Sequence, residues 1–377
     1  MSIINYLTAI RFAPGAAADL PQDLARLGIE RPLWVTDRGI VAAGLLDRLL
    51  GIAGLDAGPF IFQETPSNPT EEATLAALLV YETNECDGIV AIGGGSSLDL
   101  AKAVALLATH RQPLTQYAAI EGGVARITAA VSPLIAIPTT AGTGSEVGRA
   151  ALITLSDGRK VGLISPHLIP KLAICDPQLT LGLNPKLTAA TGMDAITHCI
   201  ETFLSPRFNP PADAIALDGL RRGMANIERA TRHGHDLDAR GEMMMAALQG
   251  GLTFQKGLGA VHGLSHALGS LRQPSMHHGM LNAILLPEVL RFNEPAVKKE
   301  RWQALRAAAS CPGDVSLDAH LAALVARLDL PARLSELGYD GSGTDEIIEK
   351  AMADHSTSTS PRGMSAESYR TILSKAQ

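Results

Sequence analysis

The stretch Gly88–Ser97, GIVAIGGGSS, decides the fold that this sequence predicts. An apolar run, Gly88–Ile92, leads into three glycines and two serines, and the helical pattern Leu98–Thr109 follows. Glycines let a backbone turn tightly and approach a ligand closely, and the free N–H groups at a helix start bind anions. The stretch therefore predicts a strand, a phosphate-binding turn and a helix. Because the G-x-G-x-x-G fingerprint is absent, a plain strand–helix turn with Ser97 as N-cap remains the alternative.

Apolar runs on both sides of this stretch alternate with helical patterns. We expect further strands at Pro32–Thr36, Pro59–Phe62, Leu134–Pro138 and Leu172–Asp176, and helices at Gly39–Leu50 and Glu71–Asn84. Strands separated by helices of this length predict a parallel sheet with helices on both faces. From Leu187 onward the chain is rich in Ala, Leu and Met at helical spacing. The fold class expected is an α/β N-terminal domain with a parallel sheet, residues 1–180, followed by an all-α C-terminal domain, residues 181–377.

Composition excludes several classes of protein. The chain has 377 residues, 46% of them hydrophobic and 19% charged, which is typical of a globular protein of two domains. A net charge of -6 and 4% aromatic residues argue against nucleic-acid binding. No apolar run approaches the ~18 residues that span a bilayer, and the start does not look like a signal peptide. We expect a cytoplasmic protein without nucleic-acid or membrane partners, and a homodimer or larger homo-oligomer.

A second polar turn, Thr139–Val147, follows the expected strand Leu134–Pro138 and reads TTAGTGSEV. In open α/β sheets, ligands bind outside the carboxyl ends of the strands. Two donor-rich turns at two strand ends therefore predict a dinucleotide site. Asp37 ends another expected strand, where a carboxylate accepts hydrogen bonds from a ribose diol and repels a 2′-phosphate, which favours NAD over NADP. A role for Asp37 as a helix N-cap is the alternative.

Histidines and one aspartate recur at helical spacing in the second half. Asp194 and His198 are four residues apart, as are His262 and His266, and the pair His277 and His278 follows. Residues four apart share one face of a helix, and three imidazoles with one carboxylate make a site for Fe, Zn, Co or Ni. Each histidine taken singly is more often a packed or surface residue than a metal ligand. A metal together with a dinucleotide suggests alcohol–carbonyl redox chemistry.

Five segments in this order resemble the iron-containing (group III) alcohol dehydrogenase family. They are GGGSSLDLAK (Gly93–Lys102), PTTAGTGSEV (Pro138–Val147), ATGMDAITHCIE (Ala190–Glu201), VHGLSHALG (Val261–Gly269) and HHGMLNAILLP (His277–Pro287). The resemblance implies a nucleotide-binding α/β domain, a helical metal-binding domain and an active site in the cleft. It implies NAD and Fe(II) as cofactors, with Zn as a possible replacement.

Site residues carry over by motif from this resemblance. The implied metal ligands are Asp194, His198, His262 and His278, and His266 is implied as a nearby proton-relay histidine. The spacing from His266 to the next histidines is longer than in the common family form, so His277 stays open as the fourth ligand. The implied cofactor contacts are Asp37, Asn68, Gly94, Gly95, Ser96, Asp99, Thr139, Thr140, Thr143, Ser145, Val147 and Lys160.

Within the family, the segments Val35–Gly44, Glu64–Glu71 and Ile120–Thr128 look most like the 4-hydroxybutyrate dehydrogenase branch. That resemblance implies interconversion of a 4-hydroxyacid and its semialdehyde. A carboxylate-bearing substrate requires a cation, and Arg149 and Arg272 are the candidates. A neutral primary alcohol or diol, or a maleylacetate-like keto acid, is the alternative substrate. A metal and nucleotide sensor without catalysis is the alternative from another class.

Overall fold

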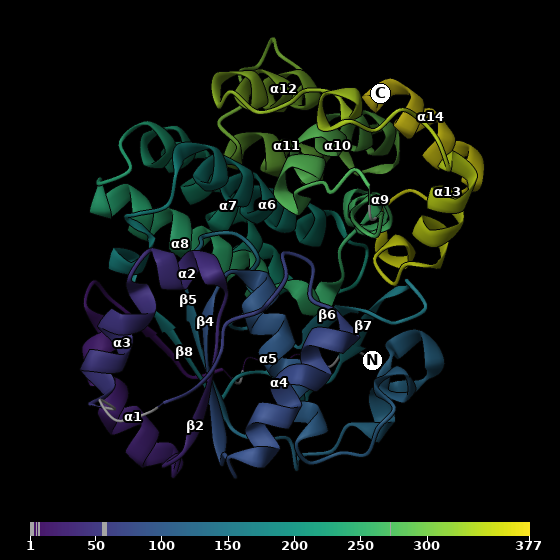
Figure 1. The fold of residues 1–377 in the computed structure, drawn as a ribbon. Coiled ribbons are helices and arrows are strands. Elements are labelled where there is room, and N and C mark those ends of the chain that lie inside the picture. The colour runs from purple at the N-terminus through teal and green to yellow at the C-terminus, as the bar shows by residue number, and fades with distance from the viewer. Residues whose placement is uncertain (1–3, 5, 7, 55–58, 272) are drawn as a thin grey trace. The chain divides into compact units, whose positions relative to one another are not determined.

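The structure of the protein is a computed structural model, and it describes every residue except 1–3, 5, 7, 55–58 and 272. The chain forms two compact units, which are coloured along the sequence in Figure 1. One unit consists of Tyr6–Thr140 and Ser145–Gly182, and the other contains Leu183–Gln377 together with the short segment Ala141–Gly144. The sequence did not indicate that this short segment groups with the helices rather than with the sheet around it.

A parallel sheet forms the centre of the first unit. Its strands, in spatial order, are β1 (Ile10–Phe12), β8 (Leu172–Cys175), β5 (Leu134–Pro138), β4 (Gly88–Gly93), β2 (Pro32–Val35) and β3 (Phe60–Phe62). Every neighbouring pair is parallel, so the carboxyl ends of these strands lie along one edge. The chain passes from β2 to β3 on one side and then adds β4 and β5 on the other. The direction of winding therefore reverses between β2 and β4, where such sheets bind ligands.

Helices cover both faces of this sheet, as the sequence predicted. They are α1 (Leu20–Leu27), α2 (Arg38–Ala42), α3 (Leu45–Ala53), α4 (Glu71–Thr83) and α5 (Gly95–Leu107), with α4 and α5 on one face and α1 and α3 on the other (Figure 1). Ile89 and Ala91 of β4 join the core beneath α4 and α5, while Val90 and Ile92 join the opposite core. A strand buried on both faces needs apolar residues throughout, which explains the continuous run in β4.

Three local features differ from the prediction. The expected helix 39–50 is broken into α2 and α3 at Gly44, whose φ is +70°. The strand β1 and the antiparallel hairpin of β6 (Ala150–Thr154) and β7 (Lys160–Ile164) were not predicted. The hairpin does carry a sequence signal, an Asp-Gly pair at Asp157 between two β-rich runs.

The second unit is helical, as predicted. Its α-helices are α6 (Pro185–Leu204), α7 (Pro210–Arg232), α8 (Leu237–Leu252), α9 (Ala260–Gly269), α10 (His278–Asn293), α11 (Lys299–Ala308), α12 (Leu317–Arg327), α13 (Thr344–Ala353) and α14 (Ala366–Ala376). The central helix α6 starts at a favourable cap, because the Asn184 side chain accepts a hydrogen bond from the Leu187 N–H and Pro185 occupies the first turn. It packs against α7, α8 and α10 and is buried from Thr188 to its end.

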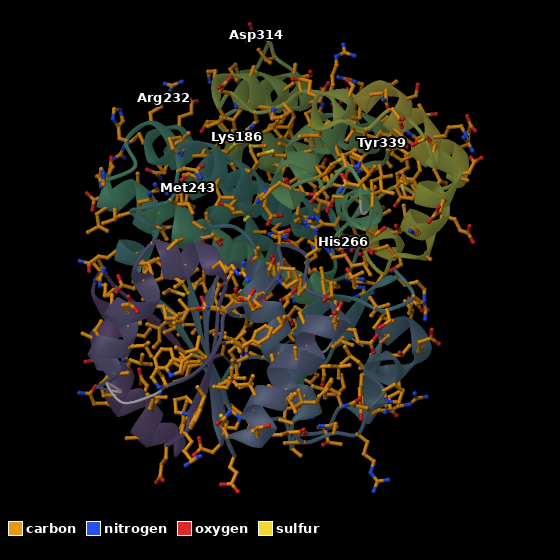
Figure 2. The ribbon with its side chains drawn as sticks, viewed as in Figure 1. Lys186, Arg232, Met243, His266, Asp314 and Tyr339 are labelled. Atoms are coloured by element: carbon orange, nitrogen blue, oxygen red, sulfur yellow. The ribbon has the colours of Figure 1, made fainter. Side chains whose placement is uncertain are left out.

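Side chains of this unit divide as expected between interior and surface. Arg232 and Asp314 are exposed, whereas Met243 lies in the interior (Figure 2). His266 is a polar residue that is also buried, and it belongs to the cluster described below. Among the helices that the structure describes, none combines the length and apolar character that crossing a bilayer demands.

Candidate metal centre and nucleotide-binding turns

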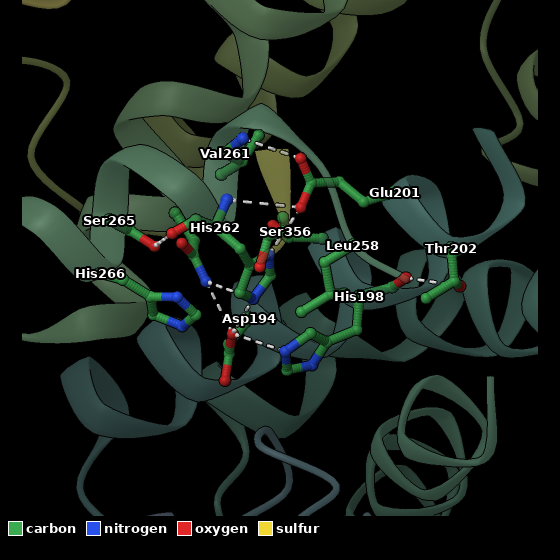
Figure 3. A network of polar contacts seen from close by, with 12 residues as sticks. Asp194, His198, Glu201, Thr202, Leu258, Val261, His262, Ser265, His266 and Ser356 are labelled. Atoms are coloured by element: carbon green, nitrogen blue, oxygen red, sulfur yellow. Dashed lines mark hydrogen bonds and ion pairs between the residues drawn. The ribbon is translucent and has the colours of Figure 1, made fainter. Parts of the chain in front are cut away.

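One carboxylate oxygen of Asp194 is the centre of a buried cluster of imidazoles. Its Oδ1 lies 3.4 Å from Nε2 of His198, 3.7 Å from Nε2 of His262 and 3.5 Å from Nε2 of His278. The ligand atoms of Asp194, His262 and His278 all lie within 4.8 Å of one another. Figure 3 shows the Asp194 carboxylate below the ring of His262 and beside the ring of His198. Two residues of α6 thus meet one residue each from α9 and α10.

The spacing of Asp194, His262 and His278 fits a bound metal ion, and His198 is close to the carboxylate of this group. Four ligands at 2.0–2.2 Å from one ion, in tetrahedral geometry, are ~3.3–3.6 Å apart. The three distances from the Asp194 oxygen are close to that range. Two rings are also held with the same edge toward the carboxylate, because Nδ1 of His198 lies 3.2 Å from the Gly142 carbonyl and Nδ1 of His262 lies 2.6 Å from Glu201. Nε2 of each ring therefore faces the Asp194 carboxylate, as that of a metal ligand would.

The charges in the cluster respond to burial and to one another. Burial alone opposes ionisation of Asp194, but the surrounding histidines outweigh it and hold the pKa of that carboxyl well below its usual range. Burial lowers the pKa of His198 to about 4, so this ring is neutral at pH 7. Burial also disfavours charge on His262, but Asp194 and Glu201 raise its pKa to about 9. In the metal-free protein a proton on His262 offsets part of the negative charge of Asp194 and Glu201, and a cation can take its place.

His278, and not His277, points its ring into this cluster. His278 is the first residue of α10, whereas His277 is the exposed residue before that helix. One turn along α10, the Asn282 amide donates a hydrogen bond of 2.7 Å to Asp194 Oδ1 and lies 3.2 Å from Nε2 of His278. Its carbonyl oxygen is buried and has no hydrogen-bond partner among the described residues. An unsatisfied buried oxygen next to the cluster is compatible with a nearby ion or water.

His266 lies beside the cluster and is held by a carboxylate that the sequence did not indicate. Its ring is stacked on that of His278 at 5.4 Å between centroids, and its Nδ1 lies 3.0 Å from Oδ2 of Asp354. Burial disfavours the charged form of Asp354, but His266 and His355 keep the pKa of that carboxyl well below its usual range. The His355 ring is also stacked on that of His266, at 6.0 Å between centroids. This aspartate–histidine pair adjoins the candidate metal site.

Sequence reasoning missed three residues of this cluster. Glu201 and Asn282 had a usable signal, since each follows a proposed ligand by one helical turn and shares its face. Asp354 is 88 residues from His266 and comes from the end of α13, so no local pattern connects the two.

In the α/β unit, the predicted glycine turn joins β4 directly to α5. Gly93 has a φ of +145°, and a Cβ there would lie 2.7 Å from Oγ of Ser97. Gly94 is the N-cap of α5, so the helix begins at Gly95 and Ser97 lies inside it rather than capping it. The first N–H groups of α5 face the carboxyl edge of the sheet, where an anion would be bound.

The second polar turn and Asp37 lie at neighbouring strand ends. The Thr139 N–H donates to the Gly93 carbonyl at 3.0 Å, and a Cβ on Gly94 would meet the Thr140 hydroxyl at 3.4 Å. Asp37 follows β2 and caps α2, because its Oδ1 accepts from Gly39 N–H and Ile40 N–H. Its Oδ2 also accepts a hydrogen bond from Ser97 at 3.3 Å, across the point where the winding reverses. The N-cap role is therefore observed, and a ribose contact stays a prediction.

Other predicted cofactor residues border the same edge. Ser96 donates to the Ser67 carbonyl at 2.5 Å, and Lys160, the first residue of β7, donates to Oδ1 of Asn68 at 3.2 Å. Asp99 forms its hydrogen bonds within the protein, since its carboxylate accepts from the Ser145 hydroxyl at 2.6 Å and from Leu152 N–H at 2.9 Å. We therefore assign Asp99 to the support of the Ser145 loop.

A buried lysine fixes the loop that contains Ser145 and Val147. Lys102 of α5 is fully buried and donates to Oγ of Ser145 at 2.8 Å and to the carbonyls of Gly148 and Ala150 at 2.9 and 2.8 Å. Burial lowers its pKa to about 8. Val147 is buried as well. The loop position is thus set by a side chain from the glycine-turn helix.

Thr143 differs from its neighbours in this turn. It lies in the segment Ala141–Gly144, which packs on the helical unit. A Cβ on Gly142 would meet Thr191 of α6 at 2.8 Å, and a Cβ on Gly144 would meet Gly251 of α8 at 2.6 Å. The two glycines are needed for this close approach.

Of the two arginines proposed to bind the substrate carboxylate, the structure describes only Arg149. Arg149 is half-buried, immediately before β6, and its carbonyl accepts a hydrogen bond from Ser165 N–H at 3.0 Å. Arg272 lies outside the described residues.

Comparison with known proteins identifies the family. The family model for iron-containing alcohol dehydrogenase matches residues 8–177, and the model for the C-terminal part of the Fe-containing alcohol dehydrogenase family matches residues 188–377. A 4-hydroxybutyrate dehydrogenase of Cupriavidus necator is 53% identical, with all of each chain covered. A crystal structure of 1,3-propanediol oxidoreductase superimposes with a TM-score of 0.92 at 33% identity, with all of each chain covered.

A third relative carries a bound nucleotide in its crystal structure. It is a sulfoacetaldehyde reductase of Bifidobacterium kashiwanohense in complex with NAD+, with a TM-score of 0.87, 26% identity and coverage of 100% of this chain and 99% of that one. The chain belongs to the iron-containing alcohol dehydrogenase family, whose relatives named here are oxidoreductases acting on CH–OH groups.

Proposed function

We propose that this protein is a metal-dependent, NAD(H)-linked alcohol dehydrogenase that interconverts 4-hydroxybutyrate and succinic semialdehyde, or a similar carboxylate-bearing pair. The observation that carries the metal-dependent part is the Asp194 oxygen with three imidazole nitrogens at 3.4–3.7 Å. The substrate is suggested by the full-length relative that is 53% identical and named 4-hydroxybutyrate dehydrogenase.

Asp194, His198, His262 and His278 are the proposed ligands of a divalent ion, Fe(II) in the first place and Zn(II) as a replacement. An ion held there supplies a Lewis acid for the oxygen of an alcohol or aldehyde. The protein holds the ligands before the ion arrives, since two of the rings are already oriented through Nδ1. Burial of Asp194, His198 and His262 limits the access of water, which strengthens electrostatic interactions at the site.

His266 is the proposed site of proton exchange. With Asp354 ionised, the proton on Nδ1 of His266 is held in their 3.0 Å hydrogen bond. In that arrangement Nε2 is the ring nitrogen that would take up or release a proton. Asp354 then orients the ring and stabilises its protonated form, as a buried carboxylate does for a catalytic histidine.

The NAD(H) cofactor, which takes up or supplies the hydride, is proposed to bind at the carboxyl edge of the sheet. The Gly93–Gly95 turn and the start of α5 would accept the pyrophosphate, because the first N–H groups of a helix have no partner within the helix and Gly94 is the N-cap of α5. Asp37 would accept hydrogen bonds from the adenosine ribose. The NAD+ complex of the sulfoacetaldehyde reductase supports this choice of cofactor.

Arg149 and Arg272 are the proposed partners of the substrate carboxylate. The test is a panel of C2–C6 aldehydes with and without a terminal carboxylate, assayed with NADH and with NADPH after anaerobic reconstitution with Fe(II) or Zn(II). Wild-type enzyme should prefer succinic semialdehyde and NADH. Arg149→Ala should raise KM for the semialdehyde ~10- to 100-fold, the value of one charged hydrogen bond, and leave KM for a neutral aldehyde of equal length unchanged. Arg26→Ala, at an exposed site, is the control.

The alternatives give different results in the same panel. Equal use of charged and neutral substrates, with no selective effect of Arg149→Ala or Arg272→Ala, would favour a neutral alcohol or diol, as the name of the 1,3-propanediol relative suggests. Preference for a keto acid would favour a maleylacetate-type reductase. A protein that binds metal and NADH but turns over no substrate would favour the sensor.

A further inference from the structure

Glu201 is a buried carboxylate that the proposed chemistry does not use. Its Oε1 accepts a hydrogen bond from Val261 N–H at 2.8 Å, and its Oε2 accepts one from Nδ1 of His262 at 2.6 Å. The His262 backbone N–H also approaches Oε2, at 3.4 Å. Figure 3 shows these contacts above the Asp194 cluster. Glu201 is 4% exposed. A buried carboxylate without hydrogen-bond partners would destabilise the fold, so its contacts with Val261 and His262 are needed to keep the charge there.

The first contact caps the helix that carries His262. Helix α9 begins after Gly259, which has no side chain to accept the N–H groups of the first turn. Glu201 supplies that acceptor from another helix, and a negative charge at a helix N-terminus is favourable. A Cβ on Gly259 would lie 2.6 Å from Oε1 of Glu201, so the glycine makes room for this carboxylate.

The position of Glu201 on α6 connects it to the proposed ligands. Asp194, His198 and Glu201 are spaced by four and three residues, which places all three on one face of the helix. One helix therefore supplies two ligands and the carboxylate that contacts a third. A shift of α9 relative to α6 would break the Glu201 contacts and the ligand geometry together.

We infer that Glu201 is a positioning residue for the metal: it fixes the ring and tautomer of His262 so that Nε2 faces Asp194, and it thereby strengthens metal binding. This inference rests on the proposed metal function. The hydrogen bond at Nδ1 assigns the proton to that nitrogen, which keeps the lone pair of Nε2 for the ion. Carboxylates that hold a ligating histidine in this way tune many metal sites.

A carboxylate, and not an amide, is required at this position. Glu201 has two acceptor oxygens, one for Val261 N–H and one for His262 Nδ1–H. A glutamine of the same shape has one acceptor and one donor. It can cap α9 or accept from His262, but it cannot do both. If its NH2 group faces Nδ1, the ring must carry its proton on Nε2, where the ion would bind.

The test compares metal affinity in Glu201→Gln and wild type, by titrating the metal-free proteins with Co(II) and recording its visible absorption. Glu201→Gln should bind Co(II) ~10- to 100-fold more weakly, with an altered spectrum, while far-UV circular dichroism stays the same. Glu242→Gln on α8 removes one carboxylate at a surface ion pair in the same unit and should leave affinity unchanged. Equal affinity and an equal spectrum in Glu201→Gln would overturn the inference.

Gly259→Ala tests the same contact without changing Glu201. Because the added methyl group would press on Oε1, this variant should also weaken Co(II) binding. If Glu201 mediates the effect, the double variant that carries Glu201→Gln and Gly259→Ala should have the same Co(II) affinity as the single variant that binds Co(II) more weakly. Fully additive losses would show that Gly259→Ala acts by another route and would contradict the inference.

The outcome separates this inference from the proposed function. Wild-type protein that binds no Co(II) would remove the metal function and the role of Glu201 with it. Wild-type protein that binds Co(II) and turns over substrate, with affinity unaffected in Glu201→Gln and Gly259→Ala, would overturn only the role of Glu201.

Discussion

The two units place polar groups in opposite ways. In the helical unit, the polar cluster consists of buried side chains gathered from α6, α9, α10 and the end of α13. In the α/β unit, the glycine turn between β4 and α5 lies within a few residues of sequence and offers mainly backbone N–H groups. The comparison teaches that the helical cluster depends on tertiary packing and on single side chains. The glycine turn depends on local backbone conformation and on buried side chains such as Lys102 that hold the neighbouring loop.

The largest effect should come from removing the shared carboxylate. Asp194→Ala should lower turnover by ~1,000-fold or more, because an ion that stabilises charge in the transition state contributes several kcal/mol. NADH binding, measured by fluorescence, should be unchanged, since the turn belongs to the other unit. Loss of NADH binding in a folded variant would contradict the division of work between the units.

A smaller effect should come from removing Lys102, the buried lysine that holds the Ser145 loop of the α/β unit. Lys102→Met leaves Ser145 and two carbonyls without their donor, which should lower the free energy of unfolding of the α/β unit by ~2–4 kcal/mol and weaken NADH binding. Trp34 reports on this unit by fluorescence in a Trp302→Phe background, because the chain has only these two tryptophans. Co(II) affinity should not change. Normal stability and normal NADH affinity in Lys102→Met would show that Lys102 does not support the Ser145 loop or nucleotide binding.

The buried acid beside that lysine should give a pH-dependent effect. Burial raises the pKa of Glu146 from 4.5 to about 7. A raised folded-state pKa gives stability that is present below pH 4.5 and is lost as pH rises to about 7. Glu146→Gln does not titrate, so its stability relative to wild type should increase across that window, by up to ~3 kcal/mol, and then level off. A constant difference between pH 4.5 and 7.5, in urea unfolding followed by Trp34, would contradict this.

The smallest expected effect concerns the choice of nucleotide. Asp37→Ser keeps an N-cap for α2 but removes the negative charge that would repel a 2′-phosphate. Discrimination between NADH and NADPH in kcat/KM should fall ~10-fold, about 1.4 kcal/mol. Unchanged discrimination with normal folding would leave Asp37 as a helix cap only.

The glycine turn and the sheet could be predicted because their signals are local. The apolar run of β4 and the glycines after it occupy consecutive positions, and each strand of a parallel sheet must be apolar on both faces. The split at Gly44 shows the limit, since a helical pattern continues across a residue whose φ of +70° ends the helix. The hairpin of β6 and β7 was missed although its Asp-Gly turn is visible in the sequence.

The proposed ligand set could be predicted only from helical spacing together with family resemblance. Spacing placed Asp194 with His198 and His262 with His266, but it could not show that His262 and His278 contact Asp194 while His266 turns to Asp354. That arrangement is set by how α6, α9, α10 and α13 pack. The same holds for the segment Ala141–Gly144, whose glycines are explained by contact with α6 and α8 and not by the turn they seemed to form.

The most direct test of the account is the position of a metal ion in crystals of the Fe(II)- or Zn(II)-loaded protein, located by anomalous scattering. We predict one ion at ~2.0–2.2 Å from a carboxylate oxygen of Asp194 and from Nε2 of His198, His262 and His278. An ion bound elsewhere, an ion that excludes two or more of these residues, or crystals that take up no ion at saturating metal would contradict the central claim.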